Sequence, residues 1–184
     1  MIRKLVLVAA VAALTVGPSL AVASPASAAG PHGLACTLAG SAAFKPGLTA
    51  TAKAYTYTFT GNLTNCQSTD ATLKTGTVKA TGKGSGTCVN GTGAGVAAIK
   101  WNNRKVTAIK FTTTSAGAAV DVATTVVKSV VISGVTYTTS EVATVVNDQG
   151  AGALAFQADA TKCNTTTGLT TATFNGPIGS GNSQ

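Results

Sequence analysis

The sequence predicts an all-β protein, a single disulfide-linked β-sandwich, with a closed β-barrel as the alternative architecture. The first observation is composition, since threonine, valine, alanine and glycine dominate the chain. Threonine and valine are β-branched, so they suit a pleated strand better than a helix. The second is periodicity: short segments alternate apolar and polar residues, and no helical period continues beyond the N-terminal apolar segment. The third is a set of four cysteines that all follow that segment.

The N-terminal 28 residues have the features of a signal peptide. Met1 to Lys4 carry positive charge, Leu5 to Val16 form an apolar stretch too short to span a bilayer, and Ala26-Ser27-Ala28 matches a small-x-small cleavage site. We therefore expect a secreted, extracellular protein. It would consist of a signal peptide (1–28), a single all-β domain (29–175) and a disordered tail rich in Gly, Ser and Asn (176–184).

The first half of the expected domain contains the clearest strand pattern. In segment 53–64, aromatic residues at odd positions alternate with threonines at even positions: Tyr55, Tyr57 and Phe59 against Thr56, Thr58 and Thr60. Such a period of two is typical of a half-buried strand. Turn residues such as Pro46-Gly47 and Asn90-Gly91 separate this segment from its neighbours. Strands are expected at 36–44, 53–64, 75–82, 95–101 and 104–114, and residues 82–88 alternate glycine with other residues.

The segment 120–146 is the most hydrophobic part of the chain after the leader. Its apolar residues occupy both parities, which predicts burial on both faces, and Ser133-Gly134 predicts a hairpin turn. Strands at 152–159 and 169–174 complete the pattern of eight or nine strands. The glycine strings at 82–86 and 91–95 lack the context of a phosphate-binding loop and indicate close backbone approach or bending of a sheet.

The four cysteines allow three disulfide pairings. If strand 36–44 forms a hairpin with strand 54–66, the outer ends of the hairpin meet, so Cys36 can reach Cys66. Cys88 and Cys163 are then partners by elimination. A metal site is disfavoured because the chain has no CxxC or CxxH spacing. We predict two structural disulfides and no metal.

Charge is positive but dispersed. Removal of the leader would leave eleven basic and five acidic residues, a net charge of +6, and only Arg104-Lys105 forms a basic pair. A surface that follows phosphates would need clustered cations with aromatic stacking partners, so nucleic acid is disfavoured as a partner. A weak attraction to an anionic cell envelope is compatible with the charge. No transmembrane helix is expected after the leader, and the partner remains unknown.

The titratable residues do not form a recognisable catalytic set. The five carboxylates are isolated in sequence (Asp70, Asp121, Glu141, Asp148 and Asp159), and the single histidine, His32, precedes the first cysteine. General acid–base and nucleophilic catalysis both need such groups to converge. We therefore predict a protein that is not an enzyme and that needs no cofactor.

One turn combines residues that are common in binding surfaces. Trp101, Asn102, Asn103 and Arg104 bring an aromatic ring, two amides and a cation together, and they form the candidate contact surface. The competing interpretation is that Trp101 anchors the core and the other three residues form an ordinary hairpin turn.

Short motifs along the chain resemble those of a group of small secreted actinobacterial proteins. They are Cys36 to Thr49 with Gly40, Phe44 and Pro46-Gly47, then Phe59-Thr60-Gly61-Asn62-Leu63 with Cys66, then Gly84 to Cys88, and Trp101-Asn102-Asn103. The resemblance implies export from a Gram-positive bacterium, a single β domain and two disulfides. It implies no activity and no catalytic residues.

Two functional hypotheses follow. In the first, the protein is an exported, non-enzymatic β domain that binds an envelope component, a protein partner or a small apolar ligand. In the alternative, it is a membrane-active protein whose residues 120–146 insert as part of an oligomeric pore, because the Thr/Val alternation is similar to that of lipid-facing strands. Asp121, Lys128 and Glu141 within that segment argue against insertion.

Overall fold

The computed structural model describes residues 33–141 and 143–181. The predicted signal peptide therefore lies outside the described residues. The described chain forms ten strands and one short 3-10 helix, η1 (Ala160–Asn164). The strands are β1 (Leu34–Leu48), β2 (Lys53–Ser68), β3 (Gly76–Gly86), β4 (Asn90–Trp101), β5 (Val106–Ala116), β6 (Ala119–Val127), β7 (Ser129–Ile132), β8 (Val135–Thr138), β9 (Gln149–Gln157) and β10 (Leu169–Gly181).

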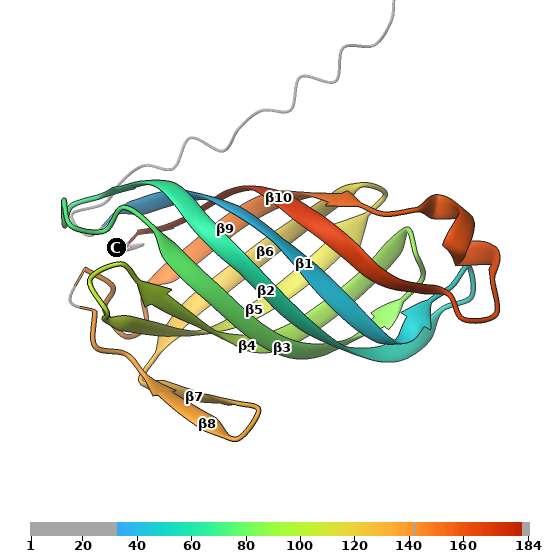
Figure 1. Ribbon diagram of the computed structural model, residues 1–184, viewed down its shortest axis with the longest axis horizontal. Coiled ribbons are helices and arrows are strands. Elements are labelled where there is room, and N and C mark those ends of the chain that lie inside the picture. The colour runs from blue at the N-terminus through green and yellow to red at the C-terminus, as the bar shows by residue number, and fades with distance from the viewer. Residues whose placement is uncertain (1–32, 142, 182–184) are drawn as a thin grey trace, which may run out of the picture.

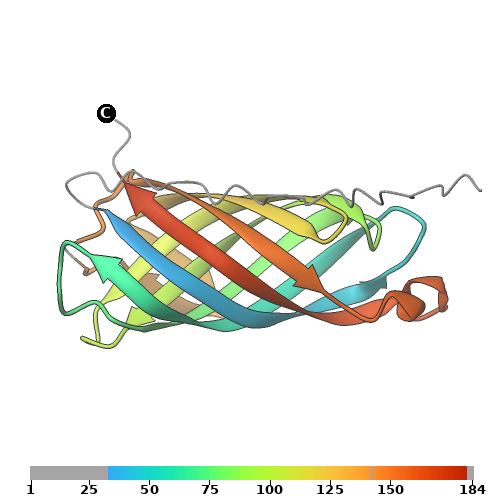
Figure 2. The ribbon, with the colours of Figure 1, turned by 90° about the horizontal axis from the view of Figure 1, so that it is seen from above.

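Eight of these strands close into an antiparallel barrel with the order β1-β10-β9-β6-β5-β4-β3-β2. Closure is visible in β1, which pairs with β2 on one side and with β10 on the other. Figures 1 and 2 show the strands inclined to the long axis of an elongated barrel. The all-β prediction is confirmed, and the architecture is the closed barrel that was predicted as the alternative. The strand patterns alone could not distinguish the two, because sandwich and barrel strands both alternate inward and outward side chains.

Residues of β2 alternate as the sequence predicts. The odd-numbered aromatic residues Tyr55, Tyr57 and Phe59 point into the barrel, where they pack against its core. The intervening threonines are exposed on the outer wall. The threonine hydroxyls thus face the solvent on the outside of the barrel, while aromatic rings fill part of the inside. This arrangement is expected of a strand with one buried face.

Glycines in β3 leave room for the rings of β2. Gly82 is paired with Tyr57, and a Cβ atom added at Gly82 would lie only 2.6 Å from Tyr57 Cζ. Gly84 is paired with Tyr55 in the same way, with a corresponding distance of 2.7 Å. The glycine string 82–86 therefore provides the close approach that its sequence predicts, since an aromatic ring can cover a glycine that has no side chain of its own.

The barrel has two ends that differ in construction. We call the end where β1 begins and β10 ends the base; it carries the loops 69–75, 102–105 and 140–148. We call the opposite end the mouth; it carries the connections 49–52, 87–89 and 117–118 and the segment 158–168, which contains η1. The disulfide Cys36–Cys66 joins β1 to β2 near the base, and Cys88–Cys163 joins two connections at the mouth. Both predicted pairings are confirmed.

The segment 120–146 is divided between two locations. Residues up to Val127 belong to β6 within the barrel, whereas β7 and β8 form a separate hairpin outside it (Figure 1). Val130 and Ile132 of the hairpin cover Ala98 and Ala108 on the outer wall of β4 and β5. The even-numbered valines of β6 thus face the barrel interior, and Val130 and Ile132 are buried against its outer wall, whereas Val131 is 59% exposed, so the prediction of burial on both faces is wrong in the hairpin. The predicted turn is present, with positive φ angles at Ser133 (50°) and Gly134 (80°).

The C-terminal segment differs from the prediction of a disordered tail over 176–184. Residues 176–181 continue β10, where Ile178 pairs with Cys36 of β1 and with Gly152 of β9. Residues 182–184 lie outside the described residues. Composition suggested disorder because glycine and serine are weak strand formers, but pairing with a neighbour on each side supplies the hydrogen bonds that hold this segment in the sheet.

The described chain includes no helix with the length and hydropathy required to cross a membrane.

Candidate ligand-binding cavity

The barrel encloses an apolar cavity of about 150 Å³. Its lining runs from the middle of the barrel, at residues such as Ile99 and Leu154, to the mouth, where Thr87, Ser115 and Gly117 contribute. Most of the lining side chains are aliphatic or aromatic, and all are uncharged. An eight-stranded barrel has an interior of the size that side chains nearly fill, or that holds one small ligand. In this barrel the side chains leave a cavity of about 150 Å³ unfilled.

Aromatic rings form one side of the cavity toward the mouth. Phe44 and Tyr55 meet edge to face, with their ring centroids 5.7 Å apart, and Tyr57 lies 6.1 Å from Tyr55 and 6.3 Å from Phe111. These separations are those of favourable aromatic pairs. The rings of Tyr55, Tyr57 and Phe111 point inward yet are only half-buried, because part of each ring faces the cavity rather than another side chain.

Tyr57 places a hydroxyl group in this apolar environment. Its Oη is buried and has no hydrogen-bond partner among the described residues. The Thr113 hydroxyl of β5 lies close enough to act on Tyr57 as a hydrogen-bonding group, which lowers the pKa of Tyr57, although the two hydroxyls lie outside the geometry of a full hydrogen bond. Burial, followed by the neighbouring Tyr55, raises the pKa of Tyr57 far above its ordinary value. Tyr57 therefore remains a neutral phenol with an unused donor and acceptor.

The base of the barrel is sealed by buried polar contacts. The indole Nε1 of Trp101 donates to Thr107 Oγ1 at 2.9 Å, and the Thr107 and Thr144 hydroxyls share a hydrogen bond of 2.8 Å. Thr144 belongs to the loop 140–148, so the contact ties this loop to the barrel. Leu73, from the loop 69–75, is fully buried beside the same core. The cavity is thus closed at this end.

The residues of the predicted contact surface, 101–104, lie at the turn between β4 and β5 at the base and differ in exposure. Trp101 is only 2% exposed and packs in the core, whereas Asn102 and Arg104 are exposed. The Asn102 side chain accepts hydrogen bonds from the backbone N–H groups of Lys74 and Thr75, and its amide nitrogen donates to the Thr72 carbonyl.

Asn103 and Arg104 have different local roles. The Asn103 Nδ2 donates to Glu141 Oε2 at 2.8 Å, and Arg104 has a positive φ of 67° in the turn. Glu141 is itself buried, accepts from the Ala143 backbone N–H and lies 3.8 Å from the Lys105 ammonium. The side chains of Asn102 and Asn103 thus connect the turn to the neighbouring loops of the base, while Trp101 packs in the core.

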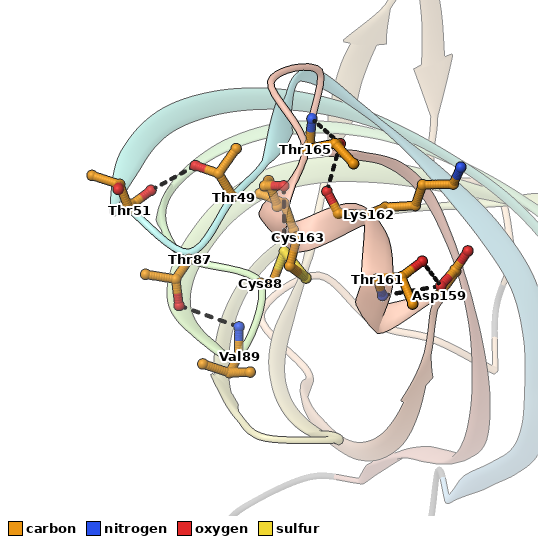
Figure 3. The surroundings of a disulfide bond; sticks show 12 residues. Thr49, Thr51, Thr87, Cys88, Val89, Asp159, Thr161, Lys162, Cys163 and Thr165 are labelled. Atoms are coloured by element: carbon orange, nitrogen blue, oxygen red, sulfur yellow. Dashed lines mark hydrogen bonds between the residues drawn. A yellow bond between two sulfur atoms is a disulfide. The ribbon is translucent and has the colours of Figure 1, made fainter.

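The mouth is held together by the disulfide Cys88–Cys163 and by backbone hydrogen bonds around it (Figure 3). The Cys88 N–H donates to the Thr49 carbonyl at 3.0 Å, and the Ala50 N–H donates to the Cys163 carbonyl at 3.1 Å. Asp159 caps η1 by accepting from the Thr161 hydroxyl and backbone N–H, and these bonds lower the pKa of its carboxyl. The disulfide and these hydrogen bonds therefore join the connections 49–52, 87–89 and 158–168 into one rim around the mouth.

The carboxylates lie at separate places in the barrel. Glu141 and Asp148 are buried at the base, where Asp148 Oδ2 accepts from the Val145 N–H at 2.7 Å, and Asp121 is exposed on the outer wall. Asp70 and Asp159 lie in loops at opposite ends. Over residues 33–141 and 143–181, no three histidine, cysteine or acidic side chains come together as a metal site would require.

The cavity was not predicted from the sequence, although one signal pointed toward it. The aromatic alternation of β2 identified the inward face that carries Tyr55 and Tyr57. Phe111 of β5, Phe156 of β9 and the other distant residues of the lining become neighbours only when the sheet closes. Comparisons with protein-family models, with curated proteins and with solved structures found no match to this chain.

Proposed function

We propose that the protein binds a small, uncharged, apolar ligand of about one ring in size inside the barrel. The observation that carries this proposal is the apolar cavity of about 150 Å³, which reaches the mouth. A cavity of about this volume lined by leucine, isoleucine and phenylalanine binds benzene in an engineered protein. The role is non-catalytic, because the lining offers hydrophobic contact and hydroxyl groups rather than a set of titratable groups.

An extracellular setting is part of the proposal. The two disulfides are consistent with an oxidising compartment. The sequence features of residues 1–28 support export in the same way. A rigid, disulfide-linked barrel is suited to carry a ligand without rearrangement, since a preformed cavity has little conformational entropy to lose when the ligand enters.

The experiment compares benzene binding by the wild type with binding by a variant whose cavity is filled. Ala97 is 2% exposed and lines the cavity, so Ala97→Leu adds three carbon atoms to the space that the ligand would occupy. Ala94, three positions earlier on the same strand, is exposed on the outer wall, so Ala94→Leu is the matched control. Ligand binding to the folded state raises the melting temperature by mass action, and this shift is the measurement.

We expect benzene at about 1–5 mM to raise the melting temperature of the wild type and of Ala94→Leu, since a millimolar Kd corresponds to about 4 kcal/mol of binding free energy. Ala97→Leu should show a much smaller shift. Circular dichroism would verify that both variants are folded. Equal shifts in all three proteins, or no shift in the wild type, would contradict the proposal.

A second candidate function is the membrane activity of residues 120–146. The observation that favours it is the exposure of valines on and after the outer hairpin: Val131 (59%), Val135 (52%), Val145 (46%) and Val146 (43%). It ranks second because β6 is already paired with β5 and β9 and would have to leave the barrel to insert. Release of a dye from liposomes is the test, with Val131→Thr/Val135→Thr as the comparison. Absence of release at micromolar protein would exclude this function.

A further inference from the structure

We infer that the Tyr57 hydroxyl is the recognition group of the cavity, and that the ligand is a neutral ring bearing one hydrogen-bonding oxygen, as in a phenol. This inference rests on the proposed function and assigns the chemical class of the ligand. It follows from the position of the Tyr57 hydroxyl, which is buried without a hydrogen-bond partner among the described residues in a lining that is mostly apolar.

The ring of Tyr57 reaches across the glycines of the neighbouring strands. A Cβ atom added at Gly82 of β3 would lie 2.6 Å from Tyr57 Oη, and one added at Gly93 of β4 would lie 3.3 Å from it. The hydroxyl therefore lies over the glycine positions of both β3 and β4. Glycine at both positions means that no side chain from these two sites can provide a hydrogen-bond partner.

The buried Tyr57 hydroxyl lacks a hydrogen bond that a ligand could supply. Tyr57 lines the cavity, and the nearest side-chain hydroxyl, that of Thr113, does not reach the geometry of a full hydrogen bond with it, so Tyr57 Oη has no such partner in the described barrel. A buried polar group without a partner loses its hydration and gains nothing in return, so such groups in folded proteins require an explanation. A ligand oxygen beside Tyr57 Oη would restore the lost hydrogen bond.

The rest of the lining restricts the ligand to a neutral ring. The lining side chains are uncharged, so an ionised group would lose its hydration without finding a counter-ion. Phe44, Tyr55 and Phe111 present ring edges and faces around Tyr57 at aromatic contact distances. These surfaces favour an aromatic ligand over an aliphatic one of the same size. A phenol satisfies all of these conditions, because it combines a neutral ring with one oxygen that can donate or accept.

Benzene and phenol are the probes, since they differ by one oxygen atom. The dissociation constants of both would be measured by calorimetry or NMR titration for the wild type and for Tyr57→Phe, which removes only the hydroxyl. The ratio of phenol affinity to benzene affinity is the readout, because it cancels the general effect of the substitution on the cavity. Tyr55→Phe is the control, since Tyr55 is a second tyrosine in the same lining.

We expect the ratio to fall about five- to tenfold in Tyr57→Phe, the range that one hydrogen bond provides, and to change less than about twofold in Tyr55→Phe. Thermal unfolding would establish that Tyr57→Phe is as stable as the wild type. If benzene binds but the ratio is unchanged, the inference is wrong and the proposed function stands. If neither probe binds to the wild type, the proposed function itself fails.

Discussion

Trp101 and Thr107, on adjacent strands, are joined by a hydrogen bond of 2.9 Å from the indole Nε1 to the threonine Oγ1 at the sealed base of the barrel. Thr107 is 1% exposed and Trp101 is 2% exposed, so water does not reach this bond. The Thr107 hydroxyl also pairs with Thr144 Oγ1 at 2.8 Å. A single hydroxyl thus satisfies a buried indole and connects the wall of the barrel to the loop 140–148.

Thr107→Val is the first prediction. Valine has the shape of threonine but no oxygen, so both the Trp101 N–H and the Thr144 hydroxyl would lose their partner while remaining buried. An unsatisfied buried group costs about 1–3 kcal/mol, so the free energy of unfolding should fall by about 2–3 kcal/mol. Urea unfolding followed by tryptophan fluorescence would measure the change, since Trp101 is the single tryptophan in the chain.

The control is Thr112→Val on the outer wall of the same strand, where the side chain is exposed. This substitution should change the free energy of unfolding by no more than about 0.5 kcal/mol. A result in which both variants lose the same stability would show that the buried network at the base contributes nothing specific.

Gly82→Ala is the second prediction. The added Cβ would lie 2.6 Å from Tyr57 Cζ and 2.5 Å from the Ala94 carbonyl oxygen, so the aromatic ring or the strand must move. Overpacking of this kind costs about 1–3 kcal/mol, which chemical denaturation would detect as a lower midpoint. Gly91→Ala is the control, because its nearest neighbour, the Ser85 carbonyl oxygen, would be 3.1 Å away. Equal stability of the two variants would contradict the role assigned to the Gly82 site.

These glycines also show how far the sequence could lead. The alternation of Tyr55, Tyr57 and Phe59 with threonines predicted the inward face of β2, and the glycine strings predicted close approach. Both features are local, because each depends on residues one or two positions apart. The pairing of Cys36 with Cys66, which are 30 positions apart, was predictable because it follows from a single hairpin.

Closure of the sheet was not predictable from local pattern. It depends on the pairing of β1 with β10, whose residues Cys36 and Ile178 are neighbours in space but lie near opposite ends of the chain. The glycine- and serine-rich composition of residues 176–181 even suggested disorder, because composition carries no information about a partner strand. The cavity depends on that closure, so the lining contributed by β9 and β10 could not be anticipated.

The disulfide at the mouth is the subject of the third prediction. Cys88 and Cys163 are separated by 75 positions and Cys36 and Cys66 by 30, so a chain-entropy model assigns about 4.5 and about 3.7 kcal/mol to the two bonds. Cys88→Ser/Cys163→Ser and Cys36→Ser/Cys66→Ser should both lower the melting temperature. The folded Cys88→Ser/Cys163→Ser variant should also bind benzene more weakly. Without this disulfide, the connections that contain Thr49, Cys88 and Cys163 are no longer joined at the mouth.

The second disulfide provides the matched comparison for binding. Cys36–Cys66 lies near the base, away from the mouth, so its loss should reduce stability while leaving the benzene affinity of the folded fraction unchanged. Measurements at a temperature where both variants are folded separate the two effects. If both variants bind benzene as the wild type does, the rim is not required to form the cavity.

Tyr57 provides the last prediction, which concerns alkaline pH. Burial raises the pKa of this phenol above the ordinary value of 10.0, so above pH 10 the unfolded chain releases a proton that the folded protein still holds. The stability of the fold therefore does not depend on the titration of this group below pH 10, and it falls progressively as the pH rises above 10. The free energy of unfolding of Tyr57→Phe should depend less on pH between about 10 and 12, as measured by urea denaturation at each pH.

At pH 7, the free energy of unfolding of Tyr57→Phe should equal or exceed that of the wild type, because the substitution removes an unpartnered hydroxyl. Parallel curves for the wild type and Tyr57→Phe would mean that the phenol is hydrated in the folded protein, and they would also remove the basis for its role in recognition.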